Sequence, residues 1–362
     1  MSEMVESQLY AVVMAGGKGT RFWPESTRKR PKQYLNLTGG DSLLGKTLQR
    51  FEGLVGANQR YVVTVKEQEL LAKECGANKM AKDGLIFEPS GRNTAPCILL
   101  SLAALEEKGA NGDDVIAIVP SDHVILNESG FRETVQKAAE MALKEKAIVT
   151  IGIKPNFPHT GYGYIHRASE VSADVFSVSD FREKPDRKTA ENYLATGEYF
   201  WNAGMFVASL NTLKEEFSTC SPETFKHYED LKNSVSDDSA LAEVYARLPE
   251  DSIDYAVMEK SKRVMVVAAD FDWNDLGSWD ALESVVDSTE GNTLVAQRAH
   301  FLKEAKGNIV FAAGKHVSLI GVDNLIVVSN EQSLVVLPKE RSQEIKEIVK
   351  SLQENSELTD LI

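Results

Sequence analysis

The sequence predicts an α/β protein with a doubly wound, mixed and mostly parallel sheet, followed by a small C-terminal β-helix-like domain. Two observations carry this prediction. Over the first part of the chain, short and almost continuously apolar runs alternate with amphipathic segments, a pattern typical of a parallel sheet covered on both faces by helices. After residue 290, short apolar runs recur about every 7–9 residues, which is typical of a small β structure.

The buried strands of the main sheet are expected where apolar residues run together. These runs are residues 9–15, 61–65, 85–88 and 115–120. Amphipathic helices are expected between and after them, at residues 43–51, 66–75, 95–108 and 131–146. Asn93 and Pro96 mark the start of the third helix, because asparagine caps helices and proline is tolerated in their first turn.

The middle of the chain is less regular, with strands expected at 147–153, 175–181 and 203–208 and a polar helical region at 212–247. In the C-terminal part, successive β rungs are expected at 310–311, 317–320, 325–328 and 334–337, and an amphipathic helix at 340–352. We therefore divide the chain into a catalytic domain, 1–289, and a β-helix-like domain, 290–362.

Composition excludes several classes of protein. A net charge of −14 disfavours a dedicated nucleic-acid binder, which needs a broad basic face. The three scattered cysteines form no zinc or disulfide pattern and suit a reducing compartment. The N-terminal residues are partly acidic and lack the apolar core of a signal peptide, and no apolar run is long enough for a membrane span. We expect a cytoplasmic protein without membrane contact.

A glycine-rich turn directly follows the first strand. It comprises Gly16, Gly17, Lys18, Gly19, Thr20 and Arg21. Glycines allow backbone N–H groups to converge on an anion. Six cations lie between residues 18 and 32, and Glu25 is the one acidic residue among them. This local excess of positive charge in an acidic chain predicts a polyphosphate ligand.

Two well-known glycine motifs do not fit this turn. A Walker A loop ends in Gly-Lys-Ser/Thr after a four-residue gap, and this turn does not. A dinucleotide fingerprint needs a third glycine three positions after the second, where Phe22 stands. P-loop nucleotidases and NAD-type oxidoreductases are therefore disfavoured.

The turn does resemble another family. Residues 15–21 (AGGKGTR) with 31–33 (PKQ) resemble the signature of the sugar-nucleotide pyrophosphorylases, and 22–24 (FWP) with 30–33 (RPKQ) resemble their mannose-1-phosphate guanylyltransferase branch. The resemblance implies a Rossmann-like, GT-A-like nucleotidyltransferase domain. It also implies Mg²⁺-dependent transfer of GMP from GTP to α-D-mannose 1-phosphate. The isomerase domain fused to some bacterial members is expected to be absent.

The resemblance implies a catalytic group of Arg21, Lys32, Asp122 and Asp275. Asp122 directly follows the strand expected at 115–120, where open α/β sheets place their ligands. Asp275 lies in residues 271–279 (FDWNDLGSW). Mg²⁺ prefers one or two carboxylates with water and phosphate, and aspartates at these two positions hold the metal in the resembled family. The alternative is that Asp122 caps a helix and Asp275 forms a turn.

The nucleotide is expected to contact the glycine-rich turn and residues 88–96 (EPSGRNTAP), which contact the base in the resembled family. The predicted nucleotide-binding residues are Gly16, Gly17, Lys18, Gly19, Thr20, Glu88, Arg92, Asn93, Thr94 and Ser121. Side chains such as Asn93 and Thr94 offer both donors and acceptors to guanine. The alternative is that they only cap the following helix.

Three segments match the hexose-phosphate motifs of the family: residues 160–165 (TGYGYI), 181–185 (FREKP) and 201–206 (WNAGMF). The predicted substrate-binding residues are Gly163, Glu183, Lys184 and Asn202. Glu183 would accept from sugar hydroxyls, and Lys184 would meet the sugar phosphate. Arg182 departs from the small or apolar residue common in the family, and no role is assigned to it. His123 is not expected to be a metal ligand, and Trp273 and Trp279 are expected to be partly buried in the core.

Several alternatives stay open at this stage. The sugar could be a different one, such as a heptose. A catalytically silent subunit that binds sugar nucleotides is a second possibility, although such a protein should have lost loop cations or a metal aspartate. The C-terminal rungs leave open strand edges, which predicts a homodimer through this domain unless the final helix covers them.

Overall fold

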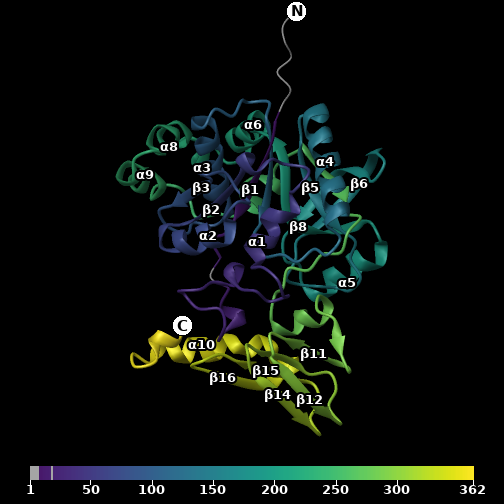
Figure 1. Cartoon of the computed structure of the whole chain (residues 1–362). Helices are drawn as coiled ribbons and strands as arrows, with labels where there is room; N and C mark the ends of the chain where they lie inside the picture. The colour runs from purple at the N-terminus through teal and green to yellow at the C-terminus, as the bar shows by residue number, and fades with distance from the viewer. Residues whose placement is uncertain (1–7, 18) are drawn as a thin grey trace, which may run out of the picture.

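The computed structural model describes residues 8–17 and 19–362. The chain folds into a large sheet flanked by helices and a smaller β domain beneath it (Figure 1). Helix α10 (Ile345–Glu354) lies along the side of the smaller domain that faces the large sheet (Figure 1). Lys18 and residues 1–7 lie outside the described residues, so the predicted role of Lys18 stays a prediction.

The large sheet has nine strands within the described part of the chain. They are β1 (Leu9–Met14), β2 (Arg60–Val65), β3 (Leu85–Glu88), β4 (Val115–Pro120), β5 (Ile148–Ile153), β6 (Tyr164–Ser172), β7 (Val175–Arg182), β8 (Tyr199–Ser209) and β9 (Val264–Ala268). Their order is β3-β2-β1-β4-β8-β5-β9-β7-β6. The first four strands in this order pair in parallel, and β8 lies antiparallel between β4 and β5. The predicted mixed α/β sheet is confirmed, although β6 and β9 were not predicted.

Helices cover both faces of this sheet. They are α1 (Leu43–Arg50), α2 (Glu69–Gly76), α3 (Thr94–Glu107), α4 (Glu128–Glu145), α5 (Arg187–Thr196), α6 (Leu210–Cys220), α7 (Pro222–Phe225), α8 (Tyr228–Ser234) and α9 (Asp238–Tyr245). Short 3₁₀ or π turns are Thr20–Phe22, Lys32–Tyr34, Ala57–Gln59, Lys66–Gln68, Asp254–Met258, Trp279–Ser284 and Thr359–Leu361.

Residues 212–247 are helical, as expected, but the expectation that this region is polar was wrong. The region is a series of short helices, α6 to α9, because Pro222 begins a new helix and turns follow it. It is also not simply polar. Phe217, Tyr228 and Tyr245 are buried in the core that β1, β4 and α3 share. The apolar residues are spread over several short helices, which hides the amphipathic period.

The C-terminal domain has the predicted β-helix-like winding. Its strands are β10 (Ser288–Thr289), β11 (Asn292–Val295), β12 (Ala299–Lys303), β13 (Ile309–Ala312), β14 (His316–Ile320), β15 (Leu325–Ser329) and β16 (Leu334–Pro338). Strands β11, β13 and β15 pair in parallel in one sheet, and β12 and β14 pair in parallel in a second. The chain thus alternates between two sheets, and β16 returns antiparallel to β15.

The structure adds detail to the two ends of this domain. The final helix was predicted at 340–352, but Lys339–Glu344 forms a 3₁₀ turn and α10 begins at Ile345. Ile345 is the first apolar residue after Pro338, so it is the first that can anchor a helix to the sheet. Strand β10 pairs with β11, so the five-stranded sheet starts at Ser288. The division of the chain at 289/290 stays a prediction.

One apolar cluster joins the two parts of the molecule. It contains Phe22 and Trp23 from the turn after β1, Trp279, and Phe311 and Val349 of the C-terminal domain. The ring of Trp279 lies 4.9 Å from that of Phe22 and 5.4 Å from that of Phe311. Trp279 Nε1 donates to the carbonyl of Trp23 at 3.1 Å. Trp279 is fully buried, so the expected core role of this tryptophan is confirmed.

Within the described residues, no helix combines the length and apolar character that a bilayer crossing requires. Cys75, Cys97 and Cys220 are all free thiols, as their spacing predicted.

The shared cluster makes a stability prediction. Phe311→Ala should lower the free energy of unfolding by about 3–5 kcal/mol, because it leaves a cavity beside Trp279. Phe301→Ala is the matched control: Phe301 lies in the same domain but is 51% exposed, so its loss should cost less than about 1 kcal/mol. Urea denaturation measures both. Equal losses for the two variants would contradict the shared core.

Candidate active site

The side chain of Gln33 helps to hold the glycine-rich turn after β1. Gln33 Nε2 donates to the carbonyls of Ala15 at 2.8 Å and Gly17 at 3.1 Å. Gly19 has a φ of 57°, and a Cβ there would lie 2.3 Å from Lys32 Cβ. Only glycine fits at this position, since the turn packs directly against the segment that carries Lys32. The glycine-rich turn and the PKQ segment, which together make up the family signature, are therefore in contact.

Lys32 is the centre of the site. Its Nζ donates to Asp122 Oδ2 at 2.8 Å and to the main-chain carbonyl of Asp275 at 2.7 Å. The Lys32 side chain is 6% exposed. Burial by itself would raise the pKa of Asp122, but the charge of Lys32 lowers it below its usual value. Two aspartates far apart in sequence are thus brought to one ammonium group.

These groups line a pocket of about 270 Å³, which we call the phosphate-loop pocket. Its lining includes Gly19, Thr20, Arg21, Lys32, Asp122, His123 and Asp275. Arg21 Nη1 donates to the carbonyl of Gly277 at 2.9 Å. The pocket therefore gathers all four residues predicted to be catalytic, although in the sequence they occupy three separate segments.

The donor set of this pocket suits a small hard cation rather than a closed metal cage. Within residues 8–17 and 19–362, no cluster of three or more His, Cys, Asp or Glu side chains could hold a metal. Two carboxylates, Asp122 and Asp275, remain as possible ligands. Mg²⁺ commonly uses one or two carboxylates and completes its shell with water and substrate phosphate.

A second pocket, which we call the Glu88 pocket, lies beside the glycine-rich turn and encloses about 300 Å³. Its lining includes Gly16, Gly17, Glu88, Arg92, Asn93 and Thr94. Six of the ten predicted nucleotide-binding residues therefore meet here, and Gly19 and Thr20 line the phosphate-loop pocket instead. Ser121 is buried, lines none of the three pockets at this edge of the sheet, and accepts a bond from Thr47 at its carbonyl.

Side chains in the Glu88 pocket are held in place by the protein. Glu88 Oε1 accepts from Tyr245 OH at 2.5 Å, and burial raises the pKa of this carboxyl. Arg92 Nη1 donates to the carbonyl of Leu248 at 2.7 Å. Asn93 Oδ1 accepts from the N–H of Thr94, so Asn93 does cap α3. The capping role and a place in the pocket coexist.

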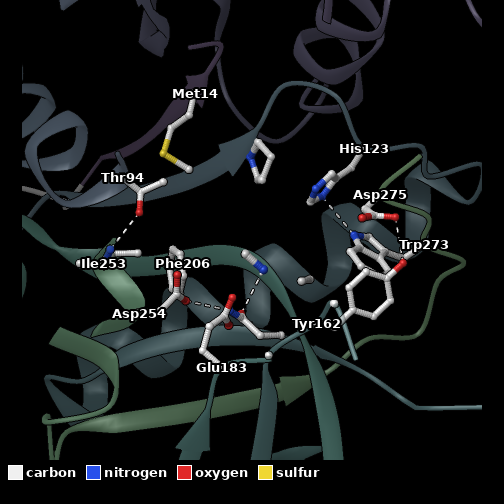
Figure 2. A pocket seen from close by; sticks show the side chains of 16 residues that line it. Met14, Thr94, His123, Tyr162, Glu183, Phe206, Ile253, Asp254, Trp273 and Asp275 are labelled. Atoms are coloured by element: carbon white, nitrogen blue, oxygen red, sulfur yellow. Dashed lines mark hydrogen bonds between the residues drawn. The ribbon is translucent and has the colours of Figure 1, made fainter. Parts of the chain in front are cut away.

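A third pocket, which we call the Glu183 pocket, lies at the carboxyl end of β4 and beside the amino-terminal half of the antiparallel strand β8, and encloses about 200 Å³ (Figure 2). Its lining includes Gly163, Glu183 and Asn202. Asn202 lies inside β8 rather than at the start of a strand. Lys184 is not in the lining: its Nζ pairs with Glu183 Oε1 at 2.5 Å, and its side chain is 60% exposed. A contact of Lys184 with phosphate stays a prediction.

Figure 2 also shows residues that sequence reasoning left out of the site. Tyr162 OH donates to Asp275 Oδ1 at 2.8 Å, and burial followed by the charge of Asp275 raises the pKa of Tyr162. Trp273 Nε1 donates to His123 Nδ1 at 3.1 Å. Trp273 thus lines the pocket as well as packing against the core, which goes beyond its expected core role. Asp254 lies beside Glu183 (Figure 2).

The sequence contained a signal for two of these missed residues but not for the third. Tyr162 stands inside the TGYGYI segment and His123 directly follows Asp122, so both were available from the motifs. Asp254 stands in no motif used above, and no local signal pointed to it.

The three pockets form one continuous cleft. Met14, Thr94 and Pro120 line both the Glu88 and Glu183 pockets, and His123 and Asp275 line both the Glu183 and phosphate-loop pockets. A cleft that combines a glycine-rich turn, cations and several carboxylates has the groups needed to hold a nucleotide, phosphates and a sugar.

Comparison with known proteins identifies the class that this fold and cleft define. A family model described as nucleotidyl transferase matches residues 10–291, so the chain belongs to this family of nucleotide-transferring enzymes. A second model, described as the MannoseP isomerase/GMP-like beta-helix domain, matches residues 299–352.

Named relatives narrow the comparison. The chain is 36% identical over 354 residues to a mannose-1-phosphate guanylyltransferase of Klebsiella pneumoniae, covering 96% of this chain and 74% of that protein. It is 35% identical over 360 residues to one of Escherichia coli K12, covering 97% and 74%. A solved structure from Thermus thermophilus, described as a mannose-1-phosphate geranyltransferase, matches with a TM-score of 0.86 and 35% identity, over 96% of this chain and 99% of that one. The family resemblance seen in the sequence is confirmed.

The packing of the glycine-rich turn makes a prediction. Gly19→Ala should lower kcat/KM for nucleotidyl transfer at least about tenfold, because a left-handed alanine costs about 1–2 kcal/mol and its Cβ would collide with Lys32. Gly53→Ala is the matched control, since Gly53 also has positive φ but has nothing within 4 Å of its added Cβ. Pyrophosphate release measures both. A Gly19→Ala enzyme as active as the control would contradict this account of the turn.

Proposed function

We propose that the chain transfers GMP from GTP to α-D-mannose 1-phosphate, giving GDP-mannose and pyrophosphate. The observation that carries this proposal is the meeting of Lys32, Asp122 and Asp275 in one pocket, which continues into the Glu183 pocket and through it into the Glu88 pocket. Phosphate groups would then lie in the same cleft as a base and a sugar. The names of the relatives supply the particular base and sugar.

The proposed reaction is an in-line displacement at the α-phosphorus. A phosphate oxygen of the sugar phosphate forms the new P–O bond, and the bond to the β-phosphate oxygen breaks to release pyrophosphate. The nucleophile is already anionic, so no general base is required. Catalysis would rest on positioning and charge neutralisation. Arg21 and Lys18 would hold the leaving phosphates, and Lys32 would neutralise the phosphates between which transfer occurs.

We assign Mg²⁺ to the carboxylates of Asp122 and Asp275. Two observations support this: both carboxylates line the phosphate-loop pocket, and that of Asp122 already accepts from a cation, Lys32 Nζ. When bound, the metal would supply charge neutralisation for the phosphates. Tyr162, which donates to Asp275 Oδ1, would orient that carboxylate, and Lys32 would turn from Asp122 toward the substrate phosphates.

At the base end, Glu88 is placed to accept from the N–H donors of guanine. Its Oε2 lies near Gly16, where a Cβ would be 3.1 Å away, so the carboxylate faces the glycine-rich turn. Thr94 and Asn93 offer further polar groups at the start of α3. The assignment of Glu88, Arg92, Asn93 and Thr94 to the nucleotide is part of this proposal.

Pyrophosphate release over a grid of nucleoside triphosphates and sugar 1-phosphates, with and without Mg²⁺, tests the proposed function. Release should be greatest with GTP and mannose 1-phosphate and should require the metal. A grid in which a heptose 1-phosphate gives the highest kcat/KM would replace the sugar assignment. A grid without release would sink the enzyme reaction and favour a silent binding subunit.

We also propose that the chain forms a homodimer through its C-terminal domain. Ile320, Leu334 and Val336 are 61%, 65% and 55% exposed, and β14 and β16 are edge strands of their sheets. Val336 pairs with Val327, which packs against the cluster between the two sheets, so the exposed apolar face continues from that cluster. A second copy that presents the same edge would cover it.

Val336→Lys should convert the dimer to a monomer in light scattering at micromolar protein, because a charge on an edge strand opposes pairing. Ala195→Lys, an exposed change on α5 of the other domain, is the control and should leave the dimer intact. A wild-type protein of monomeric mass would refute the dimer.

The metal assignment makes a sharper prediction. Asp275→Asn should lower kcat at least about 100-fold at every Mg²⁺ concentration, because the loss of metal-based charge neutralisation costs several kcal/mol. Asp270→Asn, an exposed change of the same kind five residues away, should be close to wild type. Near-normal turnover of Asp275→Asn with saturating Mg²⁺ would remove Asp275 from the metal site.

A further inference from the structure

Asp254 is a carboxylate in the cleft that the phosphate chemistry does not use. It begins the π-helical turn Asp254–Met258 and lines the Glu183 pocket. Figure 2 shows it beside Glu183, at the end of the pocket away from Asp275. A carboxylate at that end would repel a phosphate, so we expect the ligand group that meets Asp254 to be something other than phosphate.

The protein fixes the position of this carboxylate from the nucleotide side. The N–H of Ile253 donates to Thr94 Oγ1 at 2.8 Å, and the N–H of Ala95 donates to the carbonyl of Asp251 at 3.1 Å. The residues just before Asp254 are therefore tied to the first turn of α3. These contacts hold Asp254 in the cleft, so it does not lie on a free surface loop.

Asn202 has its hydrogen-bonding groups committed to the protein. Its Oδ1 accepts from the N–H of Gly204 at 3.0 Å and from Thr150 Oγ1 at 3.2 Å. The backbone donor fixes the orientation of the amide, so Nδ2 faces Asp254 and donates to Asp254 Oδ1 at 2.9 Å. Little of Asn202 is left for a ligand. Its contacts instead orient the carboxylate of Asp254.

The charges around Asp254 favour a hydroxyl as its partner. Glu183 has a counter-charge in Lys184, but Asn202 is the one side-chain donor that reaches the Asp254 carboxylate among the described residues. Burial, followed by the charge of Glu183, raises the pKa of Asp254 to about 6, so the group is still mostly ionised at neutral pH. The ammonium of Lys184 acts on Asp254 but forms its ion pair with Glu183, and a partly buried carboxylate in this position is stabilised by O–H donors.

We propose that Asp254 is a sugar-specificity residue whose carboxylate accepts a hydrogen bond from a hydroxyl of the bound sugar 1-phosphate, and that Asn202 is its positioning residue. Glu183 and Asp254 then offer two acceptors side by side, a pair that a sugar with neighbouring hydroxyls satisfies. This inference rests on the proposed function, because it takes the Glu183 pocket as the sugar end of the cleft.

Steady-state kinetics of Asp254→Asn test the proposal. KM for mannose 1-phosphate should rise about 10–100-fold, the scale of a hydrogen bond to a charged group, while KM for GTP and the melting temperature stay at wild-type values. Asp238→Asn is the matched control: it is the same change on an exposed residue of α9, outside the pocket lining, and should leave both KM values unchanged. Calorimetric titration with mannose 1-phosphate gives a second readout that does not depend on turnover.

Deoxy sugars distinguish two causes of a raised KM: the loss of a direct contact between Asp254 and a hydroxyl, and a general loosening of the pocket. Wild type and Asp254→Asn are compared on mannose 1-phosphates that lack one hydroxyl at a time. If Asp254 binds one hydroxyl, one deoxy sugar should be used about equally by the two enzymes, while the other deoxy sugars keep the 10–100-fold difference. Asn202→Ala should weaken sugar binding in the same direction, and combining it with Asp254→Asn should add little.

Two results would overturn the proposal. One is an unchanged KM and calorimetric affinity for mannose 1-phosphate in Asp254→Asn. The other is an equal difference on every deoxy sugar. Failure of the proposed function has a separate signature: wild type would then prefer another sugar 1-phosphate or release no pyrophosphate. With a different preferred sugar, the same comparison on that sugar decides the role of Asp254, and with no release the calorimetric comparison decides it.

Discussion

The site depends on one buried ammonium group. Lys32 Nζ lies between the carboxylate of Asp122 and the carbonyl of Asp275, and thereby joins the turn after β1, the end of β4 and the segment before Trp279. Because the Lys32 side chain is almost fully enclosed, its charge is poorly screened by water and each partner matters. Removing Lys32 or Asp122 would leave the charge of the other unpaired, so the ligand-free site is held in shape by the group that would also meet substrate phosphate.

The C-terminal domain takes part in this arrangement and is more than an appendage. The glycine-rich turn, which ends at Arg21, and the segment that leads from it to Lys32 would lose much conformational entropy on ordering. Phe22 and Trp23 from the same turn pack with Trp279 and with the C-terminal sheet. Trp23 Nε1 also donates to the carbonyl of Leu361 at 2.7 Å. Packing by the second domain thus offsets the cost of ordering the phosphate-binding turn.

The acidic groups of the cleft are tuned by their surroundings. The charge of Lys32 keeps the pKa of Asp122 low despite burial, whereas burial raises the pKa of Glu88 and Asp254. A carboxylate that faces cations suits a metal and phosphates. Carboxylates in less charged, partly enclosed pockets suit neutral N–H and O–H donors of a base and a sugar. In the proposed function, the same side-chain chemistry would therefore serve three parts of one substrate pair.

Local patterns in the sequence determined much of this protein. Apolar runs predicted β1 to β4 and four rungs of the C-terminal domain, β13 to β16, because the burial of a strand is a local demand on residue type. The glycines and cations of residues 15–33 predicted a phosphate-binding turn for the same reason, and their resemblance to a family was confirmed. Tertiary structure alone decided which distant groups meet: Lys32 with Asp122, Asp122 with Asp275, Tyr162 with Asp275, and Asn202 with Asp254. Those pairs depend on strand order and on contacts between segments far apart in the chain, and no local period or motif encodes such contacts.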